Sequence, residues 1–476
     1  MNDKQGRWLA LYTLCLGNLM IVLDTNIVNV ALPAIQGDLG FTPTALAWVV
    51  NAYMLTYGGF LLLGGRLGDI LGNRRVFLGA VVAFTLASVA CGLAPSSGLL
   101  VAGRAVQGLG GAAVSAVALA LIMGLFDDPA ERAKAMAVYG FVMSGGGAIG
   151  VLLGGVLTGF LTWHWVFLVN LPIGVVVWLL GARVLPRRAA VRGTTRLDVV
   201  GAVLVTGALV LLVYGVVSGR AGLPYVGGGV ALLALFVGWE ARCDHPLVPL
   251  RLFRLRNLVV AQAVGALWAG AMFATFFLSS LYLQRVLGYD ALSVGLAFLP
   301  TSVVMAVFSL RWSDKLVIRF GPKPPLVAGL ALVAVGLGLL ARVPADGGYV
   351  LDVLPAMLLT GVGAGVALNP VLIVAMSDVD PSEAGLASGL ANTSFSMGGA
   401  LGLAVLASVA TWRSDALSAS GVAQGEALTG GFQLAFAAGA LFALAAAVLG
   451  GLLLRPVTNA SQAADRSDAA AEPAAA

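Results

Sequence analysis

Two charged residues lie inside long apolar stretches of the sequence, Asp24 and Arg104. An Asp or Arg at the centre of a membrane helix costs about 2.5–3.5 kcal/mol even on the lower scales, so such residues usually serve a function. A buried carboxylate can bind and release a proton, whereas a guanidinium beside it keeps its charge. We therefore predict that Asp24 and Arg104 are proton-coupling residues.

The predicted depths of these two residues support an interaction. Asp24 lies about seven residues, and Arg104 about five, from the same end of their predicted helices, which at about 1.5 Å per residue is a similar depth. The alternative is a static ion pair that only fixes helix packing. The position that corresponds to Arg104 in the second half of the chain, near Met357, has no charge. An ion pair that only fixed helix packing would be expected in both halves. Its absence from the second half therefore favours the functional interpretation.

The composition predicts a membrane protein. Of 476 residues, 59% are hydrophobic and only 10% are charged, against roughly 25% charged in soluble domains. The net charge of +5 does not indicate a nucleic-acid partner, because the basic residues lie in short loops between apolar runs. The expected surroundings are the lipid bilayer of the inner (cytoplasmic) cell membrane.

Fourteen apolar runs have the length of a membrane-spanning helix. They lie near 9–31, 44–64, 76–94, 99–123, 136–160, 164–184, 199–217, 223–240, 258–283, 292–311, 325–343, 350–374, 386–410 and 431–454. With a cytoplasmic N-terminus, 22 of the 27 Lys and Arg residues fall on the cytoplasmic side, four outside and one within a span. This division predicts that both termini are cytoplasmic.

The chain contains an internal repeat. Asp128-Pro129-Ala130-Glu131 returns 252 residues later as Asp380-Pro381-Ser382-Glu383, and each leads into a glycine-rich run. A parallel repeat in so apolar a chain is typical of transporters whose halves rock around a central site. We predict an all-α fold of two six-helix halves and two inserted helices. The expected units are residues 1–8, 9–184, 185–257 for the inserted pair, 258–454, and a disordered tail over 455–476.

Glycines form a second signal. Gly146, Gly150 and Gly154 recur at four-residue spacing, with Gly155 adjacent, so that a neighbouring helix backbone can approach closely. Close packing alone would explain this spacing. Because the run is repeated, we also consider it a surface on which the two halves move.

These stretches resemble the major facilitator superfamily. The run from Gly65 to Arg75 is similar to its loop signature between helices 2 and 3, and the resemblance implies a conformational latch formed by Gly65, Asp69, Gly72, Arg74 and Arg75. Leu100–Gly111 resembles the helix 4 signature, whose Arg is tied to proton coupling. The run from Gly146 to Gly155 resembles the antiporter signature, with Val151 where a Pro is usual. Leu23–Pro33 and Trp163–Gly174 resemble marks of the fourteen-helix drug:proton antiporter branch.

The predicted function is export of a small amphipathic compound, such as a drug, antibiotic or secondary metabolite, in exchange for protons. Neutral polar and aromatic side chains within the spans are candidates for the substrate cavity: Asn29, Gln107, Gln262, Trp268, Phe273, Phe277, Asn369 and Asn392. The alternative within transport is proton-coupled uptake or exchange of a small metabolite. A membrane-embedded enzyme is disfavoured, because the two histidines, His164 and His245, lie at a helix end and in a loop, with no metal spacing and no nucleophile–base pair. We expect no cofactor or metal, no nucleic-acid partner, and a monomer.

Overall fold

The structure is a computed structural model that describes residues 3–126, 128–186, 198–243, 246–380 and 384–455. Within these ranges every regular element is helical, and thirteen helices are long and apolar enough to cross a membrane. α6 (Pro129–Phe160) is a further long helix. A helix satisfies its own backbone hydrogen bonds, which a bilayer cannot do, so long apolar runs must fold in this way. The predicted all-α, fourteen-helix fold is confirmed. The tail predicted to be disordered lies almost wholly outside the described residues.

The N-terminal half contains six long helices. They are α1 (Asp3–Leu39), α3 (Trp48–Leu71), α4 (Asn73–Gly92), α5 (Ser97–Leu125), α6 and α8 (Asn170–Val184), with the short helices α2 (Pro43–Leu46) and α7 (Trp165–Leu168) beside them. The predicted second helix ended near residue 64, but α3 continues to Leu71. The expected loop between the second and third spans is therefore almost entirely helical. Only Gly72 interrupts it, with φ of 91°, a conformation that favours glycine.

The C-terminal half repeats this arrangement. Its helices are α11 (Arg256–Arg285), α12 (Ala291–Val307), α14 (Lys323–Leu340), α15 (Leu354–Met376), α16 (Ala384–Ala419) and α17 (Gln424–Leu453). A π-helical turn, η3 (Phe308–Trp312), joins α12 to α13 (Ser313–Phe320), another, η4 (Tyr349–Val353), precedes α15, and a 3₁₀ turn, η2 (Leu250–Arg254), precedes α11.

The inserted pair consists of α9 (Val199–Val217) and α10 (Leu223–Glu240), joined by the turn η1 (Gly219–Gly222). α9 packs against α3 of one half and α16 of the other. At the far end of the pair from η1, two buried carboxylates anchor the chain that leaves α10. Asp198 accepts a hydrogen bond from the Leu247 amide at 3.3 Å, and Glu240 accepts one from the Val248 amide at 3.1 Å.

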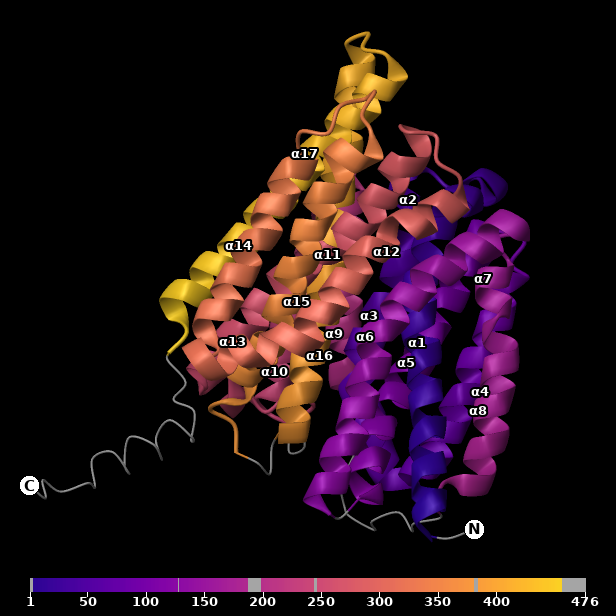
Figure 1. The fold of residues 1–476 in the computed structure, drawn as a ribbon, viewed down its shortest axis with the longest axis vertical. Helices are drawn as coiled ribbons and strands as arrows, with labels where there is room; N and C mark the ends of the chain where they lie inside the picture. Colours follow the sequence, from indigo (N-terminus) through magenta and orange to yellow (C-terminus); the bar gives the residue numbers. More distant parts are fainter. Residues whose placement is uncertain (1–2, 127, 187–197, 244–245, 381–383, 456–476) are drawn as a thin grey trace, which may run out of the picture.

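The two halves lie side by side, as the purple and orange-to-yellow ribbons of Figure 1 show. We call the side at which α1 begins and α17 ends the terminal face, and the other side the opposite face. The packing is repeated: α6 lies on α1 within one half and α12 of the other, while α16 lies on α11 and on α3. Both halves thus use the corresponding helices for the same contacts, as the sequence repeat predicts.

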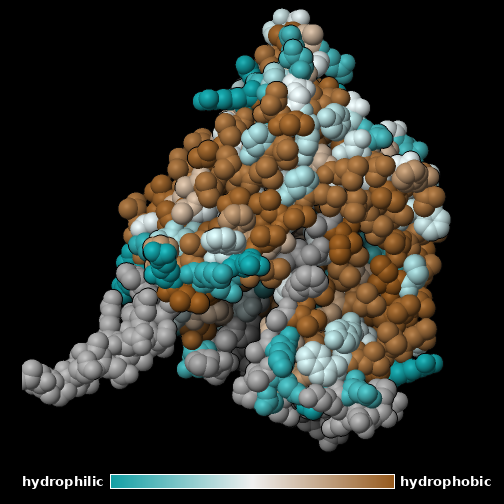
Figure 2. All heavy atoms as spheres, in the orientation of Figure 1, coloured by the Kyte–Doolittle hydropathy of each residue, from teal (hydrophilic) through white to brown (hydrophobic). Residues whose placement is uncertain are grey.

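The halves are joined near the opposite face. Ser280 of α11 donates to the Asn29 carbonyl of α1 at 2.8 Å, and Gln284 donates to the Val30 carbonyl at 3.1 Å. Figure 2 shows a broad band of apolar side chains across the face in view, and a surface hollowed between the two halves below the middle of the view. An apolar band of this kind fits the hydrocarbon region of a bilayer.

Candidate proton-coupling site

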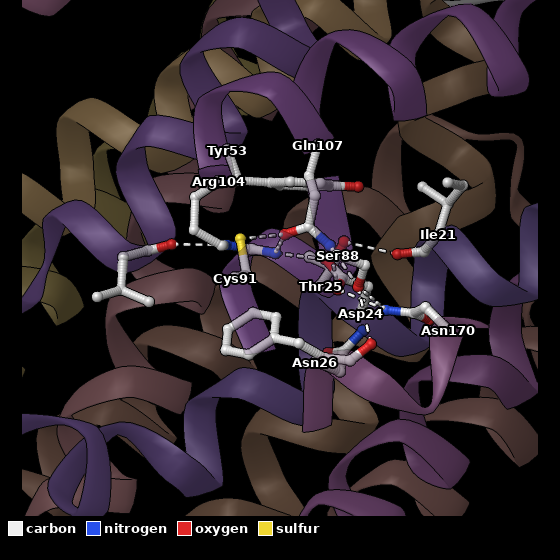
Figure 3. A network of polar contacts seen from close by, with 12 residues as sticks. Ile21, Asp24, Thr25, Asn26, Tyr53, Ser88, Cys91, Arg104, Gln107 and Asn170 are labelled. Carbon is white, nitrogen blue, oxygen red and sulfur yellow. Dashed lines mark hydrogen bonds and ion pairs between the residues drawn. The ribbon is translucent and has the colours of Figure 1, made fainter. Parts of the chain in front are cut away.

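Asp24 of α1 and Arg104 of α5 form a buried ion pair. The distance between Arg104 Nη1 and Asp24 Oδ2 is 2.5 Å, and the side chains of Arg104 and Asp24 are 1% and 0% exposed. The two residues, which the sequence predicted to lie at similar depth, are in direct contact (Figure 3). Removing one partner of such a pair typically costs 3–5 kcal/mol, because the other charge is left buried and uncompensated.

Two amides complete the surroundings of the carboxylate. Asp24 Oδ1 accepts hydrogen bonds from Gln107 Nε2 of α5 and from Asn170 Nδ2 of α8, each at 3.0 Å. The carboxylate therefore receives three donors from two helices other than its own. Gln107 was predicted to line the substrate cavity, but its side chain belongs to this network. Asn170 lies in a motif that the sequence singled out, without being assigned a role.

Ser88 of α4 fixes the orientation of both amides. Its hydroxyl donates to the Phe167 carbonyl at 2.8 Å and accepts from Gln107 Nε2 and Asn170 Nδ2, each at 2.9 Å. Because the one hydroxyl proton is already used, both amides must present nitrogen to Ser88 and thus to Asp24. The sequence offered no signal for Ser88, since a serine within an apolar helix is common.

Arg104 has partners beyond the carboxylate. Its Nε donates to the Val49 carbonyl at 2.9 Å, and its Nη1 donates to Gln107 Oε1 at 2.9 Å. The guanidinium carbon lies 4.3 Å from the centre of the Tyr53 ring, within the range of a cation–π interaction. The guanidinium thus keeps stabilising contacts that do not depend on the charge of Asp24.

Three of the four predicted glycines hold the segment of α1 that carries Asp24. A Cβ on Gly146 would lie 2.9 Å from Val22, one on Gly150 3.0 Å from the Leu23 carbonyl oxygen, and one on Gly154 2.5 Å from the Ile27 carbonyl oxygen. These distances are too short for a side chain, so the glycines allow α6 to lie directly on α1. They pack within one half and do not form a surface between the halves.

Gly155 is different, because it faces the other half. A Cβ there would lie 2.8 Å from the Ala291 carbonyl oxygen and 3.2 Å from the Gly295 Cα, both in α12. In turn, a Cβ on Gly295 would lie 3.1 Å from the Val151 carbonyl oxygen of α6. α6 and α12 therefore cross with backbone against backbone near the opposite face.

The predicted latch residues lie at the terminal face. Gly65 belongs to α3, Gly72 forms the turn, Arg75 is exposed, and Arg74 Nη2 donates to the Ala182 carbonyl of α8 at 2.7 Å. The neighbouring Arg66 donates to the Pro246 carbonyl beyond the inserted pair. The side chain of Asp69 lies outside the described part of the chain. The latch role of these residues remains a prediction.

Three of the predicted cavity residues lie close to the contact between α16 and its neighbours. Trp268 and Phe273 of α11 both contact the ring of Phe395, with centroids 5.6 and 6.0 Å apart. A Cβ on Gly399 would lie within 2.7 Å of both Phe273 and Met54, and Met54 comes from the other half. Gln262 accepts a hydrogen bond from Ser394 at 3.0 Å.

The other predicted cavity residues are dispersed. Asn369 donates to the Ser309 carbonyl and to Asp314, at the ends of η3 and α13, whereas Asn392 is exposed and donates within its own helix. Phe277 lines a separate cavity of ≈ 70 Å³ between α11, α16 and α17. The side chain of Asn29 is buried, and its carbonyl holds Ser280. These residues do not form one continuous lining.

Comparison with known proteins shows the family. The Major Facilitator Superfamily model matches residues 14–403. The chain belongs to this superfamily. Solved structures agree on the fold: a bacterial homologue of the human lysosomal transporter Spinster superposes with a TM-score of 0.68 over 95% of this chain and 98% of that chain, at 17% identity. The structure of the POT family transporter PepTSo superposes with a TM-score of 0.69 over 94% of this chain and 97% of that chain, also at 17% identity.

Relatives within the superfamily include export and resistance proteins. The puromycin resistance protein pur8 of Streptomyces alboniger is 39% identical over 96% of this chain and 93% of its own length. The cephamycin export protein CmcT of Amycolatopsis lactamdurans is 42% identical over 84% of each chain. The tetracenomycin C resistance and export protein of Streptomyces glaucescens is 34% identical over 84% of this chain and 76% of its own length.

The family defines this chain as a multi-pass membrane transporter and not an enzyme. Among the residues that the structure describes, no three His, Cys, Asp or Glu side chains are grouped in a way that could hold a metal ion. The site therefore consists of a buried carboxylate, Asp24, next to the guanidinium of Arg104.

Proposed function

We propose that this transporter exports small amphipathic compounds across the cytoplasmic membrane in exchange for protons. The observation that supports the proposal is the buried Asp24–Arg104 ion pair within two long apolar helices, because a carboxylate in such surroundings usually serves a function. Antibiotic export and resistance among the relatives supports the direction of transport and the kind of substrate.

The charge of the pair explains how a proton would act. With Asp24 ionised, the pair is neutral; with Asp24 protonated, the site carries the net positive charge of Arg104. A charge in a low-dielectric interior is costly, so protonation favours a conformation in which the site is better solvated. Proton binding and release at opposite sides of the membrane would then bias the two halves in turn.

The same charge count predicts the preferred substrates. Among the side chains that the structure describes, the other strongly buried carboxylates are Asp198 and Glu240, which lie at the ends of the inserted helices and accept hydrogen bonds from backbone amides there. One membrane-depth carboxylate can neutralise one cationic charge, so we expect export of neutral and monocationic amphipathic compounds and little export of rigid dications.

Everted vesicles from a pump-deficient host, given an imposed pH gradient, test this with one neutral, one monocationic and one rigid dicationic dye. Absence of gradient-driven efflux for every compound would contradict the proposal, and equal efflux of a rigid dication would contradict the charge count.

We also propose that the terminal face is cytoplasmic, as the distribution of basic residues predicts. Cys243 lies at this face just after α10, while Cys15 and Cys91 are buried. In intact cells a membrane-impermeant maleimide should leave the native protein unlabelled, and should label Cys243 once the membrane is permeabilised. In a Cys243→Ser background, Ser420→Cys, between α16 and α17, should react in intact cells. Labelling of Cys243 from outside would reverse the proposed orientation.

A further inference from the structure

One amide in the Asp24 network has an acceptor without a partner. Asn170 is 0% exposed, and its Nδ2 donates to both Asp24 and Ser88, but its Oδ1 makes no hydrogen bond. An unsatisfied buried polar atom is unfavourable, because it has lost its hydrogen bonds to water without gaining others. A second orientation of this amide would give the oxygen a partner.

The neighbouring amide is fully used and cannot play this part. Gln107 Nε2 donates to Asp24 and Ser88, and its Oε1 accepts from Arg104 and from the Cys91 thiol at 3.4 Å. Turning the Gln107 amide over would place its nitrogen against the guanidinium and break four contacts. Turning the Asn170 amide would break two contacts and bring its unpaired oxygen to Asp24.

We infer that Asn170 is a positioning residue that turns its side-chain amide over when Asp24 becomes protonated. In the ionised state Asn170 Nδ2 donates to Asp24 Oδ1, as the structure shows (Figure 3). A proton from water then bonds to Asp24 Oδ1, the N–H···O contact is lost, and the new O–H donates to Asn170 Oδ1. This inference rests on the proposed function, because it assigns a partner to the proton that drives export.

The groups around Asp24 leave few other acceptors for such a proton. The titratable or charged neighbours in the described network are Arg104 from α5, Tyr53 from α3 and Cys91 from α4. Arg104 and Gln107 present only N–H donors to the carboxylate, and the Ser88 hydroxyl is engaged with Phe167. The Tyr53 hydroxyl is also without a partner, but it makes no hydrogen bond to Asp24. Among the three described residues that do hydrogen-bond to Asp24, Asn170 is the one whose acceptor is unpaired, and a rotation about one side-chain bond brings that oxygen to the carboxylate.

The position of Asn170 in the fold connects this rotation to the backbone. Asn170 begins α8, and Phe167, whose carbonyl holds Ser88, lies in α7 three residues earlier. When the Asn170 oxygen faces Ser88, the Ser88 hydroxyl can donate to it and release the Phe167 carbonyl. Protonation of a side chain in α1 would thus loosen the contact between α4 and the α7–α8 junction.

Infrared difference spectroscopy of the purified full-length protein during a pH titration tests the inference. The C=O band of protonated Asp24 is identified by its loss in Asp24→Asn. In Asn170→Leu, which keeps the shape of the side chain but makes no hydrogen bonds, this band should move to higher frequency. In Asn170→Ser, whose hydroxyl both donates and accepts, the band should lie closer to its wild-type frequency. In the wild-type protein, isotope labelling of asparagine should move amide bands in the same difference spectrum, a measurement that requires no variant to fold.

Transport provides the second measurement. Asn170→Leu should lower gradient-driven efflux by at least about tenfold, equivalent to a barrier rise of about 1.4 kcal/mol. Thr85→Val is the matched control, because Thr85 also lies between α4 and α8 but hydrogen-bonds only within its own helix. The inference would be overturned if the Asp24 band did not move in Asn170→Leu and if asparagine labelling moved no amide band in the wild-type difference spectrum. If the band behaves as expected but the wild-type protein shows no proton-driven efflux, the proposed function fails instead.

Discussion

Asp24→Asn should abolish proton-driven efflux and leave a folded protein that still binds substrate. The amide has the shape of the carboxylate, and its oxygen can still accept from Arg104, Gln107 or Asn170. It cannot exchange a proton, so the site keeps the positive charge of Arg104 at every pH. Efflux in everted vesicles should fall to the background of vesicles without the protein, and its pH dependence should disappear.

Asp38→Asn is the control for this prediction. Asp38 lies on the same helix but is exposed near the opposite face, where it accepts a hydrogen bond from Trp163 at 2.9 Å. This variant should keep most of the efflux and the same pH profile. Substrate binding, followed by quenching of tryptophan fluorescence, checks that Asp24→Asn remains intact. Wild-type efflux rates with an unchanged pH profile in Asp24→Asn would refute the coupling role.

The ion pair shows how much of the site could be predicted from the sequence. A charge in an apolar run has a large energetic cost, so Asp24 and Arg104 were recognisable one at a time, and helix geometry gave their similar depth. Their contact depends on α1 packing beside α5. The repeat supplied the overall fold, because two corresponding sets of six helices must pack in corresponding ways.

Ser88 and Asn170 could not be assigned in the same manner. Neutral polar side chains cost much less to bury than charges, so neither stands out within an apolar run. Asn170 reaches Asp24 from 146 residues away in the chain, and only the packing of α8 against α1 and α4 brings them together. Gln107 was chosen for the cavity because it is polar and intramembrane, but it lies one helical turn after Arg104 and faces the same carboxylate.

The glycine run illustrates a second limit of the sequence. Spacing by four residues predicts one face of close packing, and Gly146, Gly150 and Gly154 do form one face, directed at α1. The spacing does not say which helix covers that face. Gly155, one residue out of this register, is rotated about 100° around α6 and meets α12 of the other half. The glycine that makes the contact between the halves is therefore not part of the four-residue spacing.

Gly155→Leu should slow transport several-fold or more by holding the opposite face open. Even a Cβ at this position would lie 2.8 Å from the Ala291 carbonyl oxygen, a backbone atom that cannot move aside without shifting α12. A leucine adds three more carbons at the crossing, so α6 and α12 must separate and the arrangement seen here becomes unfavourable. Overpacking of a tight contact typically costs 1–3 kcal/mol, which shifts a two-state equilibrium by about fivefold to more than a hundredfold. Efflux should fall accordingly for every substrate.

Accessibility from outside measures this shift directly. Gln284→Cys, introduced at the contact between α11 and α1, should react slowly with an impermeant maleimide in the wild-type background and faster when Gly155→Leu is added. Gly140→Leu is the matched control, since Gly140 lies on the same helix and a Cβ there would meet nothing within 4 Å. If Gly155→Leu transports normally, or if the reactivity at position 284 does not rise, the crossing of α6 and α12 is not a contact that the transport cycle must close. A loss of efflux with unchanged reactivity would place the defect in substrate binding rather than in the movement of the halves.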